Sequence, residues 1–121
     1  MDELIVLNIN PSVDSYPSFL NVVKRIVTNV FVPLSIGGGI YSLERAIDCF
    51  RNGADKVILN SAVRKNIMVA SKIINHFGSQ SVVASIDYKL KEKNAWVYDW
   101  EQKKIIHGLD LRSYLNLLQE T

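Results

Sequence analysis

Apolar residues gather in four short runs along the chain, and longer segments of mixed character separate them. The runs are Leu4–Ile9, Pro33–Ile36, Val57–Leu59 and Val82–Ile86. Short apolar runs that are rich in β-branched residues are typical of strands buried on both faces, as in parallel sheets. The pattern therefore predicts four buried strands.

The segments after these runs repeat apolar residues at helical spacing. The four stripes are Phe19, Val22, Val23, Ile26 and Val30; Leu43, Ala46, Ile47 and Phe50; Ile67, Ala70, Ser71, Ile74 and Phe77; and Leu111, Tyr114, Leu115 and Leu118. Gly53 and Gly78 stand where helix C-caps belong, and Asp110 where an N-cap belongs. Cys49 and Met68 lie beside the stripes and are interpreted as packing residues.

Strands and helices thus alternate, which is the signature of a parallel α/β protein. One insertion interrupts the alternation before the last helix. The stretch "AWVYDWEQKKIIHG" alternates partly, and Glu101-Gln102-Lys103 can turn it, so it predicts a β-hairpin. No linker divides the chain, and residues 1–121 are expected to form a single domain.

Composition limits the class of protein and the cellular compartment that can be expected. The 121 residues are 48% hydrophobic, with a formal net charge of +2 and scattered basic residues, so nucleic-acid binding is not indicated. The single cysteine cannot form an internal disulfide, which favours a reducing compartment. No apolar run is long enough to span a bilayer, and the N-terminus is a poor signal peptide. A cytoplasmic protein that binds no membrane is expected.

Ligands of parallel α/β folds bind at the carboxyl ends of the strands. The second run ends in Gly37-Gly38-Gly39, directly before a helical stripe. A glycine loop at a helix start exposes backbone N–H groups beside a positive pole, which suits phosphate. The alternative is a tight turn without a ligand, and glycine content alone does not decide between the two.

The other strand ends carry Asn8, Asn60-Ser61 and Asp87-Tyr88-Lys89. Asn60 and Ser61 offer neutral donors to a phosphate, or else they simply begin a helix. Asp87 is a candidate general acid or base, or else a structural carboxylate paired with Lys89.

The stretches "DELIVLNI", "PLSIGGGI", "GADKVILNSA", "FGSQSVVASIDYK" and "GLD" resemble, in order and spacing, the cyclase subunit of imidazole glycerol phosphate synthase. The resemblance implies a partial (βα)8 TIM barrel, about half, covering the second to fifth βα units. It also implies unpaired sheet edges and an uncovered barrel-facing side. Self-association, or association with a complementary half-barrel, is therefore expected.

The resemblance further implies an ammonia-using lyase of histidine biosynthesis that works with a glutaminase partner on a phosphorylated substrate, without cofactor or metal. Asp87 matches one of two catalytic aspartates, and the other falls in the first strand, outside this chain, so the chain alone is expected to be inactive. Phosphate and substrate binding is assigned to Asn8, Gly38, Gly39, Asn60, Ser61 and Lys89. Glu3, Asp55 and Lys56 match the mouth where ammonia enters and the partner docks, although a solvated charged rim is the simpler interpretation.

Several positions depart from the family pattern. Asn8 stands where an aspartate is usual, Tyr88 replaces a smaller residue, and His107 occupies a common threonine position. His107 and His76 are interpreted as surface residues. These departures leave open a paralogous amidotransferase component of surface-polysaccharide sugar biosynthesis. The first-strand aspartate outside this chain leaves open a second alternative, a non-catalytic half-barrel that self-associates.

Overall fold

The computed structural model describes residues 2–10 and 13–119 of the chain. These residues form two compact parts, an N-terminal lobe that ends at Ala84 and a C-terminal lobe that begins at Ser85. The expectation of one domain over residues 1–121 stays a prediction. None of the helices in the described residues is long and apolar enough to cross a membrane.

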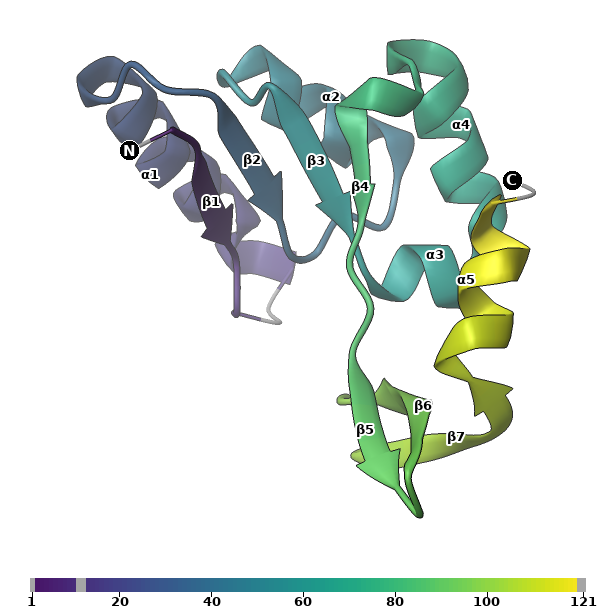
Figure 1. Ribbon diagram of the computed structural model, residues 1–121. Coiled ribbons are helices and arrows are strands. Elements are labelled where there is room, and N and C mark those ends of the chain that lie inside the picture. The colour runs from purple at the N-terminus through teal and green to yellow at the C-terminus, as the bar shows by residue number, and fades with distance from the viewer. Residues whose placement is uncertain (1, 11–12, 120–121) are drawn as a thin grey trace. The chain divides into compact units, whose positions relative to one another are not determined.

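The N-terminal lobe contains a sheet of four parallel strands in the order β1-β2-β3-β4 (Figure 1). The strands are β1 (Leu4–Leu7), β2 (Leu34–Gly37), β3 (Lys56–Leu59) and β4 (Val82–Ala84). The four predicted strands and the α/β class are confirmed. The first and fourth strands are shorter than predicted, because Ile9 is 90% exposed and the ladder of β4 ends at Ala84.

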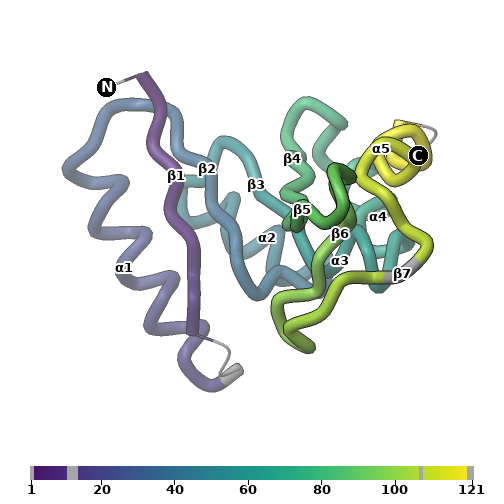
Figure 2. The backbone as a smooth tube through the Cα atoms, turned by 60° about the horizontal axis from the view of Figure 1, so that its bottom comes forward, coloured from purple at the N-terminus to yellow at the C-terminus, as the bar shows by residue number. Residues whose placement is uncertain are grey.

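Helices connect these strands, and α1 runs alongside β1 in both views of the backbone (Figures 1 and 2). The elements are η1 (Val13–Ser15), α1 (Tyr16–Asn29), α2 (Leu43–Arg51), α3 (Ser61–Lys65), α4 (Ile67–Phe77) and η2 (Ser79–Ser81). Helix α2 ends as predicted, with Gly53 at a φ of 108° beyond its C-cap, and Gly78 caps α4. The apolar stripes missed the short helix α3 ahead of α4, although the sequence offered a helix start at Asn60-Ser61 as one of two alternatives.

The two faces of the parallel sheet differ sharply in burial. Residues paired in register share a face, and on one face Leu34, Ile36, Val57 and Leu59 are at most 4% exposed. On the opposite face Ile5 is 61% exposed, Leu7 55% and Val83 39%. Ile58 lies between them on that face and is 9% exposed, so the opposite face is open mainly at β1 and β4; it is called the open face below.

The C-terminal lobe is a three-stranded antiparallel sheet, β5-β6-β7, followed by helix α5 (Figure 1). Its elements are β5 (Tyr88–Lys91), β6 (Asn94–Asp99), β7 (Lys104–Asp110) and α5 (Leu111–Gln119). The predicted hairpin is confirmed as β6 and β7. The predicted N-cap is also confirmed, since Asp110 Oδ1 accepts a hydrogen bond from Ser113 N at 3.0 Å.

The strand β5 escaped prediction for two physical reasons. Its four residues, YKLK, do alternate between apolar and charged, but the stretch is the shortest that a strand pattern can have, and all four residues are exposed, so no buried face marks it. Its turn into β6 uses Glu92 and Lys93, at φ values of 53° and 67°, where two-residue hairpin turns usually carry Asn-Gly or Asp-Gly.

The two interpreted packing residues have different outcomes. Cys49 is fully buried, which confirms the prediction for that residue. Met68 is 62% exposed, so the prediction for Met68 was wrong. It lies in the first turn of α4, one residue away from the apolar stripe, and that side of the helix faces away from the core of the N-terminal lobe.

Candidate functional site

The carboxyl edge of the parallel sheet is set by strand register. Leu7 pairs with Gly37, and Gly37 pairs with Ile58. The residues that follow these positions therefore leave the sheet at one edge, because neighbouring parallel strands end side by side. Asn8, the glycine loop and Asn60 follow the first three strands there, as the sequence predicts.

Two of the three glycines are required by close packing. A Cβ atom on Gly37 would lie 2.9 Å from Ile58 Cβ and 2.8 Å from Leu7 Cδ2. Gly38 has a φ of 90°, and a Cβ atom there would overlap the Asn8 backbone. The tight-turn interpretation thus accounts for Gly37 and Gly38 without a ligand.

Gly39 has different surroundings. Its φ is 73°, which favours glycine. A Cβ atom there would lie 3.7 Å from the Tyr16 ring, 3.8 Å from Asn8 Nδ2 and 3.3 Å from Arg45 Nη1. Side chains from three other parts of the N-terminal lobe therefore converge on Gly39, and two of them carry N–H donors.

The Asn8 side chain is held in place by its own loop. Its Oδ1 accepts a hydrogen bond from Asn10 N at 3.1 Å, and Asn8 N donates to Gly37 O at 2.8 Å. With the oxygen engaged by Asn10, the amide nitrogen is the group that borders Gly39. This neutral donor stands where the resemblance would place a carboxylate.

Helix α2 begins where the sequence predicts. Ser42 is its N-cap, and Ser42 Oγ accepts a hydrogen bond from Arg45 N at 3.2 Å. The positive end of the helix dipole therefore lies three residues after the glycine loop.

Asn60 and Ser61 follow β3 at the same edge. Asn60 occupies the N-cap position of α3, but its side chain makes no capping hydrogen bond. Ser61 is 7% exposed, and both residues interact with other parts of the chain. Their assignment to phosphate binding stays a prediction.

Asp87 and Lys89 belong to the C-terminal lobe. The Asp87 carbonyl oxygen accepts a hydrogen bond from Tyr98 N at 2.8 Å, which anchors the start of the antiparallel sheet. The Lys89 ammonium lies 4.8 Å from the centre of the Tyr98 ring, a cation–π contact. The catalytic role of Asp87 and the substrate role of Lys89 stay predictions.

Glu3, Asp55 and Lys56 lie at the amino edge of the parallel sheet. Asp55 Oδ2 accepts a hydrogen bond from Leu34 N at 2.7 Å, and Asp55 N donates to Leu34 O at 2.8 Å. Asp55 therefore has a structural function at the start of β2. Lys56 belongs to β3, paired with Ser35, and Glu3 is exposed.

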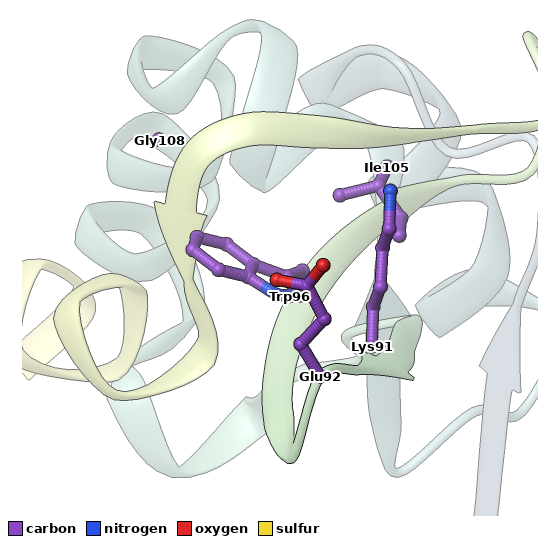
Figure 3. Close-up of a pocket in the computed structure, with 5 residues that line it drawn as sticks. All are labelled: Lys91, Glu92, Trp96, Ile105 and Gly108. Carbon is purple, nitrogen blue, oxygen red and sulfur yellow. The ribbon is translucent and has the colours of Figure 1, made fainter.

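A separate hollow lies in the C-terminal lobe (Figure 3). Its lining residues are Lys91, Glu92, Trp96, Ile105 and Gly108. Its volume of about 150 Å³ is below the roughly 300–1,000 Å³ of typical ligand pockets. None of the predicted site residues lines it.

Sequence reasoning missed Arg45 and Tyr16, which border Gly39. Arg45 donates a hydrogen bond from Nη1 to Gly39 O, and its guanidinium carbon lies 4.3 Å from the centre of the Tyr16 ring. One signal was available, because a positive charge in the first turn of a helix opposes the helix dipole. An arginine there, just after a glycine loop, therefore indicates a tertiary partner.

Comparison with known proteins places this arrangement in a family. The profile described as "Histidine biosynthesis protein" matches residues 1–120, and this is a family of TIM barrels. The imidazole glycerol phosphate synthase subunit HisF of Chlorobium limicola is 40% identical over 119 residues, covering 98% of this chain and 47% of the relative. The subunit HisF of Dictyoglomus thermophilum is 34% identical, covering 94% of this chain and 45% of the relative.

The subunit HisF of Chlorobaculum parvum is 47% identical over 88 residues, covering 73% of this chain and 35% of the relative. The chain spans about half the length of the curated relatives that it matches most fully. The parallel sheet with its helices and glycine loop agrees with the family match along the whole sequence. This chain belongs to the histidine biosynthesis protein family.

Proposed function

We propose that the chain is part of the cyclase subunit of imidazole glycerol phosphate synthase and that it binds a phosphate group of the substrate at its glycine loop. In this reaction ammonia from a glutaminase partner closes the imidazole ring, and Asp87 serves as one of two acid-base groups. The relatives named above support the proposal, since each is a subunit of that synthase.

The observation that carries the proposal is the setting of Gly39. Glycine permits an oxyanion to approach the main chain, and the start of α2 supplies a positive pole. Asn8 Nδ2 and Arg45 Nη1 border the same residue. Two donors and a helix start around a bare backbone position favour a phosphate over a neutral group.

Titration of inorganic phosphate, followed by NMR, tests this proposal. The amides of Gly38, Gly39 and Ser61 are expected to shift with phosphate in the parent and to stop responding in Gly39→Val, where a side chain occupies the oxyanion position. Gly108→Val is the matched control, because Gly108 also has a positive φ, 80°, but has no atom within 4 Å of its Cβ position. Equal shifts in the parent and Gly39→Val would show that the glycines form only a turn.

Catalysis by the isolated chain is a separate question. We expect no turnover of the ribotide with free ammonia, because acid-base catalysis by a positioned group is worth about 10²–10⁴-fold and the resemblance places one of the two aspartates outside this chain. Turnover above a blank by the purified chain would contradict this expectation.

The open face of the parallel sheet supports association with a second half-barrel, either another copy or a complementary chain. Ile5 and Leu7 are 61% and 55% exposed on it, and apolar burial is worth roughly 25 cal/mol per Å². Sedimentation at micromolar concentration tests this, and a sharp monomer that binds no apolar dye would count against it.

The second candidate function is a paralogous amidotransferase component in surface-polysaccharide sugar biosynthesis. Asn8 favours it, because a neutral amide replaces the usual carboxylate beside Gly39. The flanking genes separate the candidates, since histidine enzymes would support the first and glycan-assembly enzymes the second.

A further inference from the structure

The Arg45 side chain runs back from the first turn of α2 to the glycine loop. Its Nη1 donates a hydrogen bond to Gly39 O, while its backbone N donates to Ser42 Oγ at 3.2 Å. The two ends of the residue are therefore anchored to the same short connection between β2 and α2.

Two aromatic rings also contact the guanidinium group of Arg45. The guanidinium carbon lies 4.3 Å from the centre of the Tyr16 ring and 5.9 Å from that of Tyr41. Both distances fall within the range of cation–π contacts. Such contacts offset the unfavourable position of a cation at the positive end of a helix.

The Tyr16 ring is itself held in place by a buried contact with Cys49. Tyr16 is 5% exposed, and its hydroxyl oxygen lies 3.1 Å from the sulfur of fully buried Cys49. Cys49 stands four residues after Arg45 on α2, so both side chains lie on one face of that helix. Tyr16 begins α1, the helix that follows the β1 loop. The contact therefore links the start of α1 to α2, the helix that carries Arg45.

The hydrogen bond to Gly39 O restricts the orientation of the peptide plane between Gly39 and Ile40. In a trans peptide the carbonyl and the next N–H point in opposite directions, so anchoring Gly39 O also directs the N–H of Ile40. Gly39 has no Cβ to restrict it, and glycine is the residue whose backbone rotates most freely. The guanidinium therefore restricts a carbonyl whose rotation the glycine backbone itself leaves free.

We propose that Arg45 is the positioning residue of the phosphate site, holding the Gly39–Ile40 peptide in one orientation from a support built of Tyr16 and Cys49. This role rests on the proposed phosphate binding at the glycine loop. Arg45 acts through the loop backbone, so its removal changes the shape of the site as well as its charge.

Three variants test the proposal in the 121-residue chain. Arg45→Met removes the donor and the charge, whereas Arg45→Lys keeps a charged donor. Arg51→Met is the matched control, because Arg51 is an exposed arginine at the far end of the same helix. NMR relaxation dispersion without phosphate should show new exchange at Gly39 and Ile40 in Arg45→Met alone. Unchanged relaxation at both residues would overturn the proposal.

Phosphate titration supplies the second measurement. Arg45→Met should raise the phosphate Kd about tenfold or more, as expected when a charge-assisted hydrogen bond is lost. Arg45→Lys should recover most of the affinity, and Arg51→Met should match the parent. An unchanged Kd in Arg45→Met, with a parent that binds phosphate, would overturn the positioning role and leave the phosphate site standing.

The two proposals fail in different ways. A parent that binds no phosphate removes the proposed function, whereas the relaxation experiment still decides whether Arg45 holds the peptide. A weaker Kd in Arg45→Met without any change in relaxation would mean that Arg45 acts only by its charge, which contradicts positioning. Tyr16→Phe keeps the ring beside Arg45 but loses the contact with Cys49, so it should raise the phosphate Kd by less than Arg45→Met does.

Discussion

The two lobes of this chain are stabilised in different ways. The parallel sheet of the N-terminal lobe buries large apolar side chains completely, among them Val23, Ile36, Leu59 and Ile73. The antiparallel sheet of the C-terminal lobe has Val97 at 2% exposure and a buried carboxylate, Asp99, at 3%. The stability of the N-terminal lobe therefore depends mainly on apolar burial and close backbone approach, and that of the C-terminal lobe mainly on turns and hydrogen bonds.

The chain contains a separate probe for each lobe. Both of its tryptophans, Trp96 and Trp100, lie in the C-terminal lobe, and its one cysteine lies in the N-terminal lobe. Burial raises the pKa of the Cys49 thiol, so thiol reagents should react with it only when the lobe opens. Cysteine labelling and tryptophan fluorescence therefore follow the two lobes independently.

The largest effect is expected at Gly38. Gly38→Ala places a side chain against the Asn8 backbone at a φ of 90°. Strained backbone costs about 1–3 kcal/mol and overpacking about 1–3 kcal/mol, so we expect a loss of about 4 kcal/mol in the free energy of unfolding. Denaturant titration followed by cysteine labelling measures it.

Gly108→Ala is the control for that prediction. Gly108 shares a positive φ, 80°, but has open space around its Cβ position. It should lose only the conformational contribution of about 1–2 kcal/mol, seen in tryptophan fluorescence. Equal losses in both variants would mean that close packing at Gly38 contributes nothing.

A matched pair of valines probes burial in the two lobes. Val57 is 0% exposed and Val97 is 2% exposed. Val57→Ala should destabilise the N-terminal lobe by about 2–3 kcal/mol, from roughly 0.8 kcal/mol per buried methylene-sized group plus a cavity contribution. Val97→Ala should cost less, because a small sheet relaxes around a cavity more readily. A larger loss at Val97 would reverse the comparison.

The turn between β5 and β6 offers a stabilising change. The double substitution Glu92→Asn and Lys93→Gly supplies residues that adopt the observed positive φ values, 53° and 67°, without strain. We expect the C-terminal lobe to gain about 1 kcal/mol, measured by tryptophan fluorescence in denaturant. Cysteine labelling in the N-terminal lobe is the internal control and should not change.

The smallest effect concerns Asp110, the exposed cap of α5. The hydrogen bond from Ser113 lowers the pKa of the Asp110 carboxyl below its ordinary value. Its stabilising contribution is therefore present above the unfolded pKa of about 3.9 and is lost as the pH falls through the lower folded pKa. Unfolding followed at pH 6 and pH 3 should show a smaller pH dependence in Asp110→Ala than in the parent, and identical slopes would contradict it.

Much of the fold could be predicted because buried positions recur in the sequence as apolar residues at strand or helix spacing. The strands β1 to β4 were recognisable as apolar runs, and α2 was marked by both its stripe and Gly53. Strand β5 was not recognised, because its apolar–charged alternation covers only four exposed residues and its turn lacks glycine. Met68 shows the opposite error. It is apolar and lies beside a helical stripe, so it was predicted to pack, but its side chain is exposed.

The sequence by itself determined the order of strands and helices, the place of the glycine loop and the family. Only the tertiary structure decided that Gly37 and Gly38 are required by close packing and that Asp55 accepts a hydrogen bond from the Leu34 amide. It also decided that Arg45 donates a hydrogen bond to the Gly39 carbonyl. The physical reason is distance along the chain. Periodicity reports how each residue meets water or the core, whereas these contacts depend on strand register and helix placement, which bring separate segments together.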